Sequence, residues 1–171
     1  MNKRALITGS SSGIGFAYAR YLSEKDWNLD LISNDNIRSE KSKIDLNYKK
    51  ASFYKADLSK IESIKNIVDN FETPDLIVAN AGVAINGSIG RLTRAEKEDA
   101  YYLMCGGVID LIEGFVPSMI DKGSGRIVII SSIGAITAMP KSSIYSSIKS
   151  GVHAYGRSIS CLLYTSPSPR D

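Results

Sequence analysis

Residues 4–15, Arg-Ala-Leu-Ile-Thr-Gly-Ser-Ser-Ser-Gly-Ile-Gly, place a short apolar strand directly before a glycine-rich turn. Glycine lets the backbone turn sharply and approach a pyrophosphate closely, and a helix that starts at the turn directs its positive amino terminus at the negative charge. We therefore expect a phosphate cradle. A glycine-rich turn without a ligand is the alternative for this motif alone. The residues expected against the ligand are Gly9, Ser11, Gly13, Ile14 and Gly15.

Short apolar runs alternate with longer amphipathic runs along the chain, which is typical of strands alternating with helices. Such a βαβ rhythm predicts an α/β fold: a doubly wound parallel sheet between two layers of helices. The polar residues 34–50 are expected to form a connection. The expected strands are 4–8, 28–33, 51–55, 76–79 and 125–131, and the expected helices are 14–25, 61–70, 94–121 and 143–162.

Length and composition restrict the class of protein. The chain has 171 residues, 43% of them hydrophobic, which suits one domain. Its net charge of +3 comes without the basic stripe of a nucleic-acid binder. Cys105 and Cys161 lack metal-ligand spacing, so we expect no metal site and a reducing compartment. No stretch approaches the roughly 18 continuous apolar residues of a membrane span, and the chain opens as MNKRALITG. We expect a cytoplasmic protein without a membrane partner.

Polar residues follow three later strands. Asp57 comes after the third strand, Asn80-Ala81-Gly82 after the fourth, and Ser131-Ser132 end the fifth. The carboxyl ends of parallel strands border the ligand crevice of an open sheet, so these residues are expected to bind a ligand. Each of them alone also suits a helix cap or a turn.

Tyr145 and Lys149 lie four residues apart in the expected helix 143–162, so they share one face of it. An ammonium group beside the phenol stabilises the phenolate, and the phenol then becomes a usable acid at neutral pH. The alternative for this pair alone is an amphipathic helix that exposes an aromatic ring and a cation.

In this order and spacing the motifs resemble the classical short-chain dehydrogenase/reductase family over about residues 1–160. Residues 8–15 fit its TGxxxGxG turn, Asn80-Ala81-Gly82 fits most of its NNAG element, and Ser132 stands thirteen residues before Tyr145 of its YxxxK motif. Ser132 is therefore preferred over Ser131. The resemblance implies a Rossmann-type NAD(P)-binding domain over residues 1–161. It also implies hydride transfer between a nicotinamide and a carbonyl or alcohol substrate.

The same resemblance assigns roles to single residues. Tyr145 is the expected general acid and base, Ser132 the hydrogen-bond partner of the substrate oxygen, and Lys149 the holder of the nicotinamide ribose. The full implied cofactor set is Gly9, Ser11, Gly13, Ile14, Gly15, Ser33, Asp57, Leu58, Asn80, Ala81, Gly82, Tyr145 and Lys149. In this family, helices corresponding to 94–121 and 143–162 often pack against a second subunit, which implies a homo-oligomer for a full-length form.

Cofactor choice depends on the end of the second strand, where an acidic residue at position 33 would bind the ribose 2′-hydroxyl and favour NAD(H). Ser33 is not acidic. NADP(H) is therefore favoured, with Arg38, Lys41 or Lys43 to neutralise the 2′-phosphate. Asp35 is close enough in sequence to keep NAD(H) as the alternative.

Two features depart from the family pattern. Met104 occupies the position where the family usually has an asparagine on the helix before the fifth strand. The chain also lacks the family's last strands, which would leave the fifth strand as an exposed edge, and we expect residues 162–171 to be a disordered or non-native tail. The alternatives to an enzyme are a non-catalytic NAD(P)-binding sensor and an inactive fragment of the enzyme.

Overall fold

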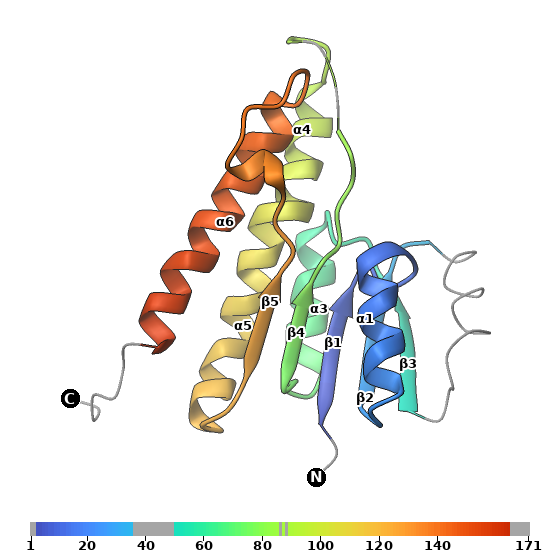
Figure 1. Cartoon of the computed structure of the whole chain (residues 1–171). Coiled ribbons are helices and arrows are strands. Elements are labelled where there is room, and N and C mark those ends of the chain that lie inside the picture. The colour runs from blue at the N-terminus through green and yellow to red at the C-terminus, as the bar shows by residue number, and fades with distance from the viewer. Residues whose placement is uncertain (1–2, 36–49, 86, 88, 165–171) are drawn as a thin grey trace.

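One parallel sheet of five strands organises the chain (Figure 1). The computed structural model describes residues 3–35, 50–85, 87 and 89–164. The strand order is β3-β2-β1-β4-β5, and the order reverses between β1 and β4. This arrangement confirms the predicted doubly wound α/β sheet. The strands are β1 Arg4–Thr8, β2 Asn28–Ser33, β3 Ala51–Lys55, β4 Leu76–Ala79 and β5 Arg126–Ile129.

Helices cover both faces of the sheet because successive side chains of each strand point to opposite faces. Ala5 and Ile7 of β1 pack in the cluster beneath α1, whereas Leu6 packs in the larger cluster on the other face. All three are fully buried. Helix α1 (Gly13–Ser23) thus forms one layer. The opposite layer contains α3 (Ile61–Asn70), α4 (Arg94–Tyr101), α5 (Gly107–Asp121) and α6 (Ser143–Tyr164).

The expected helix 94–121 is one helical run with a five-residue π-helical segment, Tyr102–Gly106, between α4 and α5. Thr93 caps its start through a reciprocal pair of bonds with Glu96. This run of 28 residues is long and apolar enough to cross a membrane by length and composition alone. In this fold its apolar side chains, among them Leu111 and Phe115, form the core against the sheet and α6.

Two element ends differ from the sequence-based expectation. Strand β5 ends at Ile129, so Ser131 and Ser132 lie beyond it. Helix α6 continues to Tyr164, three residues into the expected tail 162–171, because Leu162 and Leu163 favour a helix and the prolines come only at positions 167 and 169. Residues 165–171 and most of the connection 34–50 lie outside the described residues.

A groove of about 950 Å³ runs beside β5. Within the described part of the chain, β5 pairs with β4 alone, so its other edge faces this groove. The walls come from the ends of α5 and β5 and from the second half of α6, including Met119, Ile127 and Ile159. The exposed edge expected for the fifth strand is thus present in the described residues.

Candidate functional site

The turn between β1 and α1 packs its backbone tightly against β4. Gly9 has φ +62°, and a Cβ there would lie 2.8 Å from Asn80 Nδ2 and 2.9 Å from Ala81 Cα. A Cβ on Gly15 would clash with the Gly9 carbonyl oxygen. Gly13 has φ +56°, but no described atom lies within 4 Å of its Cβ position. Two glycines thus permit close packing, and the third leaves open space at the start of α1.

The amino terminus of α1 has the polarity that suits an anion. Its cap residue Ser12 makes no side-chain capping bond, and the first turn carries no acidic residue. The Phe16 amide donates to the Ser12 carbonyl at 3.2 Å, so the three amides before it precede the first helical bond. Such amides bind phosphate groups. Together with the open side of Gly13, they fit the pyrophosphate of a dinucleotide.

Asn80 joins this turn to the end of β4. Its Nδ2 donates to the carbonyls of Thr8 at 3.0 Å and Gly9 at 3.1 Å. In return, the Thr8 hydroxyl oxygen accepts from the amides of Asn80 at 2.9 Å and Ala81 at 3.0 Å. Gly82 follows, and its Cβ position lies 3.4 Å from Met104 Sδ. The structure therefore brings the predicted residues after β1 and β4 together at the point where the strand order reverses.

The ends of β2 and β3 carry the other predicted cofactor residues. The Ser33 hydroxyl, on a residue only 9% exposed, donates to the Ser11 hydroxyl at 2.9 Å. Asp57 is exposed and turned toward Ser59, whose hydroxyl at 2.8 Å and amide at 3.0 Å both donate to its Oδ1. These hydrogen bonds hold the pKa of the Asp57 carboxyl below its usual value. Leu58 beside it is buried in the core. The predicted cations Arg38, Lys41 and Lys43 lie outside the described residues.

Ser132 begins the 3-10 helix Ile133–Ala135, and its Oγ accepts from the Gly134 amide at 3.1 Å. This short helix packs against α6, and the Ser150 hydroxyl of α6 donates to the Ala135 carbonyl at 2.9 Å. The neighbouring Ser131 is different. Its Oγ is buried without a hydrogen-bond partner in the described part of the chain, and the residue lines the groove beside β5. The two consecutive serines therefore lie in different environments: Ser132 caps the 3-10 helix, and Ser131 lines the groove.

Lys149 connects α6 to the same loop. Its Nζ donates to the Ile130 carbonyl at 2.9 Å, two residues before Ser132, and the residue is 6% exposed. Burial lowers the pKa of the Lys149 ammonium, and the nearby Cys105 thiol opposes this effect. Tyr145 is half-buried and packs against the core one turn earlier in α6. Ser132, Tyr145 and Lys149 thus lie in two elements that pack against each other beyond the end of β5.

Met104 lies within the π-helical segment and is 1% exposed. Its thioether packs at Gly82, so this position presents no amide group to the site. The position for which the resemblance implied an asparagine therefore makes an apolar contact in this chain. The neighbouring Cys105 packs on α6 at Gly151, and burial raises the pKa of its thiol.

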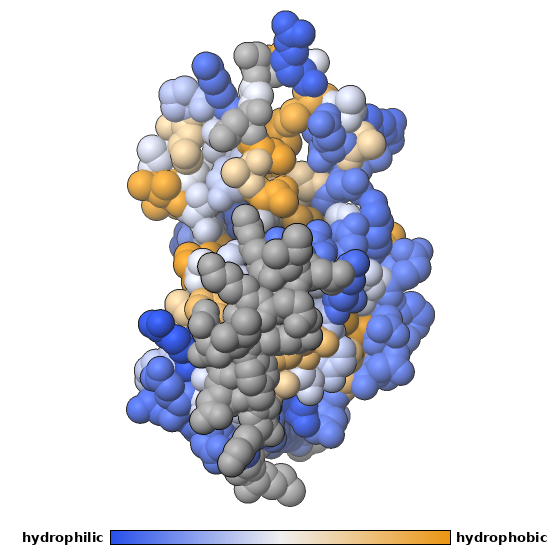
Figure 2. Space-filling model, turned by 90° about the vertical axis from the view of Figure 1, so that its right-hand side faces the viewer, coloured by the Kyte–Doolittle hydropathy of each residue, from blue (hydrophilic) through white to orange (hydrophobic). Residues whose placement is uncertain are grey.

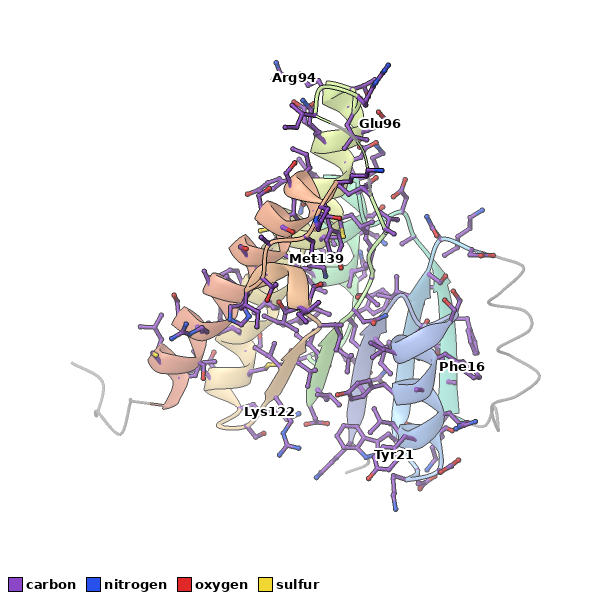
Figure 3. The ribbon with its side chains drawn as sticks, turned by 45° about the horizontal axis from the view of Figure 1, so that its top comes forward. Phe16, Tyr21, Arg94, Glu96, Lys122 and Met139 are labelled. Carbon is purple, nitrogen blue, oxygen red and sulfur yellow. The ribbon has the colours of Figure 1, made fainter. Side chains whose placement is uncertain are left out.

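Apolar side chains near Ser132 were missed by the sequence reasoning. Ile133 is 67% exposed and Ile136 74% exposed, on and directly after the 3-10 helix. Met139 also reaches the surface, from the loop that leads to α6 (Figure 3). The signal that could have revealed them is an apolar run between Ser132 and Pro140 that has neither strand nor helix periodicity. These side chains offer an apolar surface beside the Ser132 hydroxyl.

Comparison with known proteins identifies the class. The profile of the short chain dehydrogenase family matches residues 3–166, and the chain belongs to this family. It is 34% identical to the uncharacterized oxidoreductase Lmo0432 of Listeria monocytogenes over 86% of this chain and 62% of that protein. It is 29% identical to the 3-oxoacyl-[acyl-carrier-protein] reductase FabG of Chlamydia muridarum over 94% of this chain and 67% of that protein. The chain thus spans about two thirds of the length of these relatives.

Solved structures agree with the family. A metagenomic short-chain oxidoreductase in complex with NADP superposes with a TM-score of 0.86 at 25% identity, over 95% of this chain and 75% of that chain. The bulky-bulky ketone specific alcohol dehydrogenase of Comamonas testosteroni gives a TM-score of 0.88 at 23% identity, over 94% of this chain and 67% of that chain. The second likeness concerns the fold alone. The chain therefore has the Rossmann-type sheet of the short chain dehydrogenase family.

Proposed function

We propose that this protein is an NAD(P)-dependent oxidoreductase that interconverts a carbonyl and an alcohol. One observation carries the proposal: the glycine-rich turn at the start of α1 and a group of Ser132, Tyr145 and Lys149 lie at the same edge of the sheet. The names of the relatives, which include oxidoreductases and 3-oxoacyl reductases, support this reaction class.

Different residues of the site bind different parts of the dinucleotide. The amides at the start of α1 receive the pyrophosphate, with Gly13 leaving room for it. Asn80 keeps the turn in place from β4, and we assign Asp57 and Leu58 to the adenine. Lys149 keeps donors beyond the one given to Ile130, because an ammonium has three, and these hold the nicotinamide ribose. A bound nicotinamide supplies or accepts the hydride.

The chemistry of this chain's own residues takes place at the substrate oxygen. In the reducing direction that oxygen gains negative charge, and the Ser132 hydroxyl donates a hydrogen bond to it. Tyr145 delivers a proton to the same oxygen as general acid. The buried Lys149 charge stabilises the phenolate that remains. In the oxidising direction the phenolate takes the proton back.

NADP(H) is the proposed cofactor, because Ser33 places a neutral hydroxyl where a carboxylate would favour NAD(H). The NADP complex of the metagenomic relative supports this choice. For the substrate we propose a carbonyl compound with an apolar group, since Ile133, Ile136 and Met139 border Ser132 with exposed apolar surface.

Substitution of Tyr145 by Phe tests the proposal. The variant should keep the rise in unfolding temperature that NADPH causes, because ligand binding stabilises the folded state. It should lose roughly 10²- to 10⁴-fold in reduction rate across a panel of apolar ketones. Tyr155→Phe is the matched control, since Tyr155 lies on the same helix and its hydroxyl donates to Glu113 at 2.8 Å. Equal rates for both variants would refute the assignment of Tyr145.

A further inference from the structure

Ser33 and Lys55 end two adjacent strands. The parallel register of β2 and β3 pairs these two residues directly. Paired residues of neighbouring strands lie about 4.8 Å apart. The Ala56 amide donates to the Ser33 carbonyl at 3.1 Å, which keeps this register one residue past the end of β3. The two side chains are therefore immediate neighbours although 22 residues separate them in the sequence.

Both side chains leave the sheet on the face that α1 covers. In β2, Leu29 and Leu31 pack in the cluster beneath α1, and Ser33 is the next residue of the same alternation. In β3, Ala51 and Phe53 pack against that cluster, and Lys55 is the next. The surface on the β3 side carries mainly hydrophilic side chains along its outline (Figure 2). Lys55 itself is exposed.

The phosphate cradle reaches this pair of residues. The Ser33 hydroxyl donates to the Ser11 hydroxyl at 2.9 Å, and Ser11 belongs to the turn between β1 and α1. The Asp35 amide donates to Ser33 Oγ at 3.2 Å. Ser11, Ser33 and Lys55 thus form a continuous polar edge beside the start of α1. We call this edge the serine-lysine edge.

Lys55 differs from the lysines on either side of β3. Lys50 is ion-paired with Asp26 at 2.6 Å, and Lys60 with Asp99 at 2.8 Å. Lys55 makes no ion pair within the described ranges of the chain. Its charge is thus available to a ligand at the carboxyl end of β2.

We propose that Lys55 is a specificity-determining residue that binds the 2′-phosphate of NADP(H), beside the Ser11 and Ser33 hydroxyls. The inference rests on the dinucleotide binding proposed above and adds the cation that its cofactor choice requires. A phosphate monoester needs positive charge and hydrogen-bond donors, and the serine-lysine edge provides both. The carboxylate of Asp57 accepts two hydrogen bonds from Ser59. Asp35, two residues after Ser33, is the carboxylate whose negative charge would repel the phosphate.

Binding of two small nucleotides tests the role of Lys55 independently of the proposed dinucleotide site. Adenosine 2′,5′-bisphosphate carries the 2′-phosphate, and AMP has the same adenosine and 5′-phosphate without it. Each is titrated calorimetrically into the 171-residue chain and into its Lys55→Gln variant. Lys55→Gln should weaken the bisphosphate roughly tenfold or more, the usual effect of losing a charge-assisted bond, and leave AMP unchanged. Lys25→Gln is the control, because Lys25 lies beyond the other end of α1 and loses the same charge.

A second variant keeps the test decisive. Ser33→Asp places a carboxylate within the serine-lysine edge and should abolish the preference for the bisphosphate over AMP while AMP still binds. Equal affinities of wild type and Lys55→Gln for the bisphosphate would overturn the role of Lys55 and leave the dinucleotide site standing. Failure of both nucleotides to bind the wild-type chain would instead overturn the dinucleotide site itself, and the inference with it.

Discussion

Asn80→Ala removes the side chain that ties the glycine-rich turn to β4. The two lost bonds run from Nδ2 to the carbonyls of Thr8 at 3.0 Å and Gly9 at 3.1 Å. A hydrogen bond contributes about 0.5–1.5 kcal/mol net, so the free energy of unfolding should fall by roughly 1–3 kcal/mol. For a chain of this size each kcal/mol lowers the Tm by about 2–4 °C. The backbone bond from the Asn80 amide to the Thr8 hydroxyl remains in the variant.

The assay is urea unfolding followed by circular dichroism, together with NADPH titration. Asn70→Ala is a matched control, because Asn70 Nδ2 also has two partners, the Asn66 carbonyl at 2.9 Å and Oδ1 at 3.0 Å. Those bonds are exposed on α3, so their loss should change the free energy of unfolding by less than about 0.5 kcal/mol. NADPH affinity should fall for Asn80→Ala alone. Similar losses in the free energy of unfolding for the two variants would refute the reasoning that the hydrogen bonds between Asn80 and the turn stabilise the fold by this amount.

Three further outcomes follow from the geometry. Burial lowers the pKa of Lys149 from 10.5, so the unfolded chain binds the proton more tightly; the stability of the wild type relative to Lys149→Met should rise in urea unfolding as pH increases through the folded pKa of Lys149, and a relative stability that falls instead would contradict this. Gly114→Ala should destabilise by about 1–3 kcal/mol, because its Cβ would lie 2.6 Å from both Val68 methyl carbons, and Val68→Ala in the same chain should restore the Tm. Ser132→Ala should lose turnover and keep NADPH binding, whereas Ser131→Ala, which removes a hydroxyl without a partner in the described residues, should keep both; the reverse result would exchange their roles.

Much of the fold could be predicted because its signals are local. The apolar runs 4–8, 28–33, 51–55 and 76–79 match the observed strands. The glycine spacing of 8–15 depends on a turn that few other residues can form, and the family profile confirms the family that it indicated. The π-helical segment within 94–121 could not be predicted from the sequence. Over one turn its hydrogen bonds span five residues instead of four, and this leaves the spacing of the apolar residues almost unchanged.

The candidate site was predicted in part. The sequence placed Asn80 at a strand end, but its role in holding the turn depends on two carbonyls more than 70 residues away in the chain. The apolar surface of Ile133, Ile136 and Met139 was missed, because exposure is a property of the folded surface and not of residue type. The assignments of Ser132, Tyr145 and Lys149 remain predictions for the experiments above.

The sequence by itself determined the order of strands and helices, the glycine-rich turn and the preference for Ser132 over Ser131. These depend on spacing along the chain and on the backbone freedom of single residues. Only the tertiary structure decided that Ser131 faces a groove while Ser132 caps the 3-10 helix against α6. It also decided that Lys55, rather than any lysine near Ser33 in sequence, is its cross-strand partner among the described residues. The physical reason is that strand register and the choice of face place residues together that the sequence keeps apart.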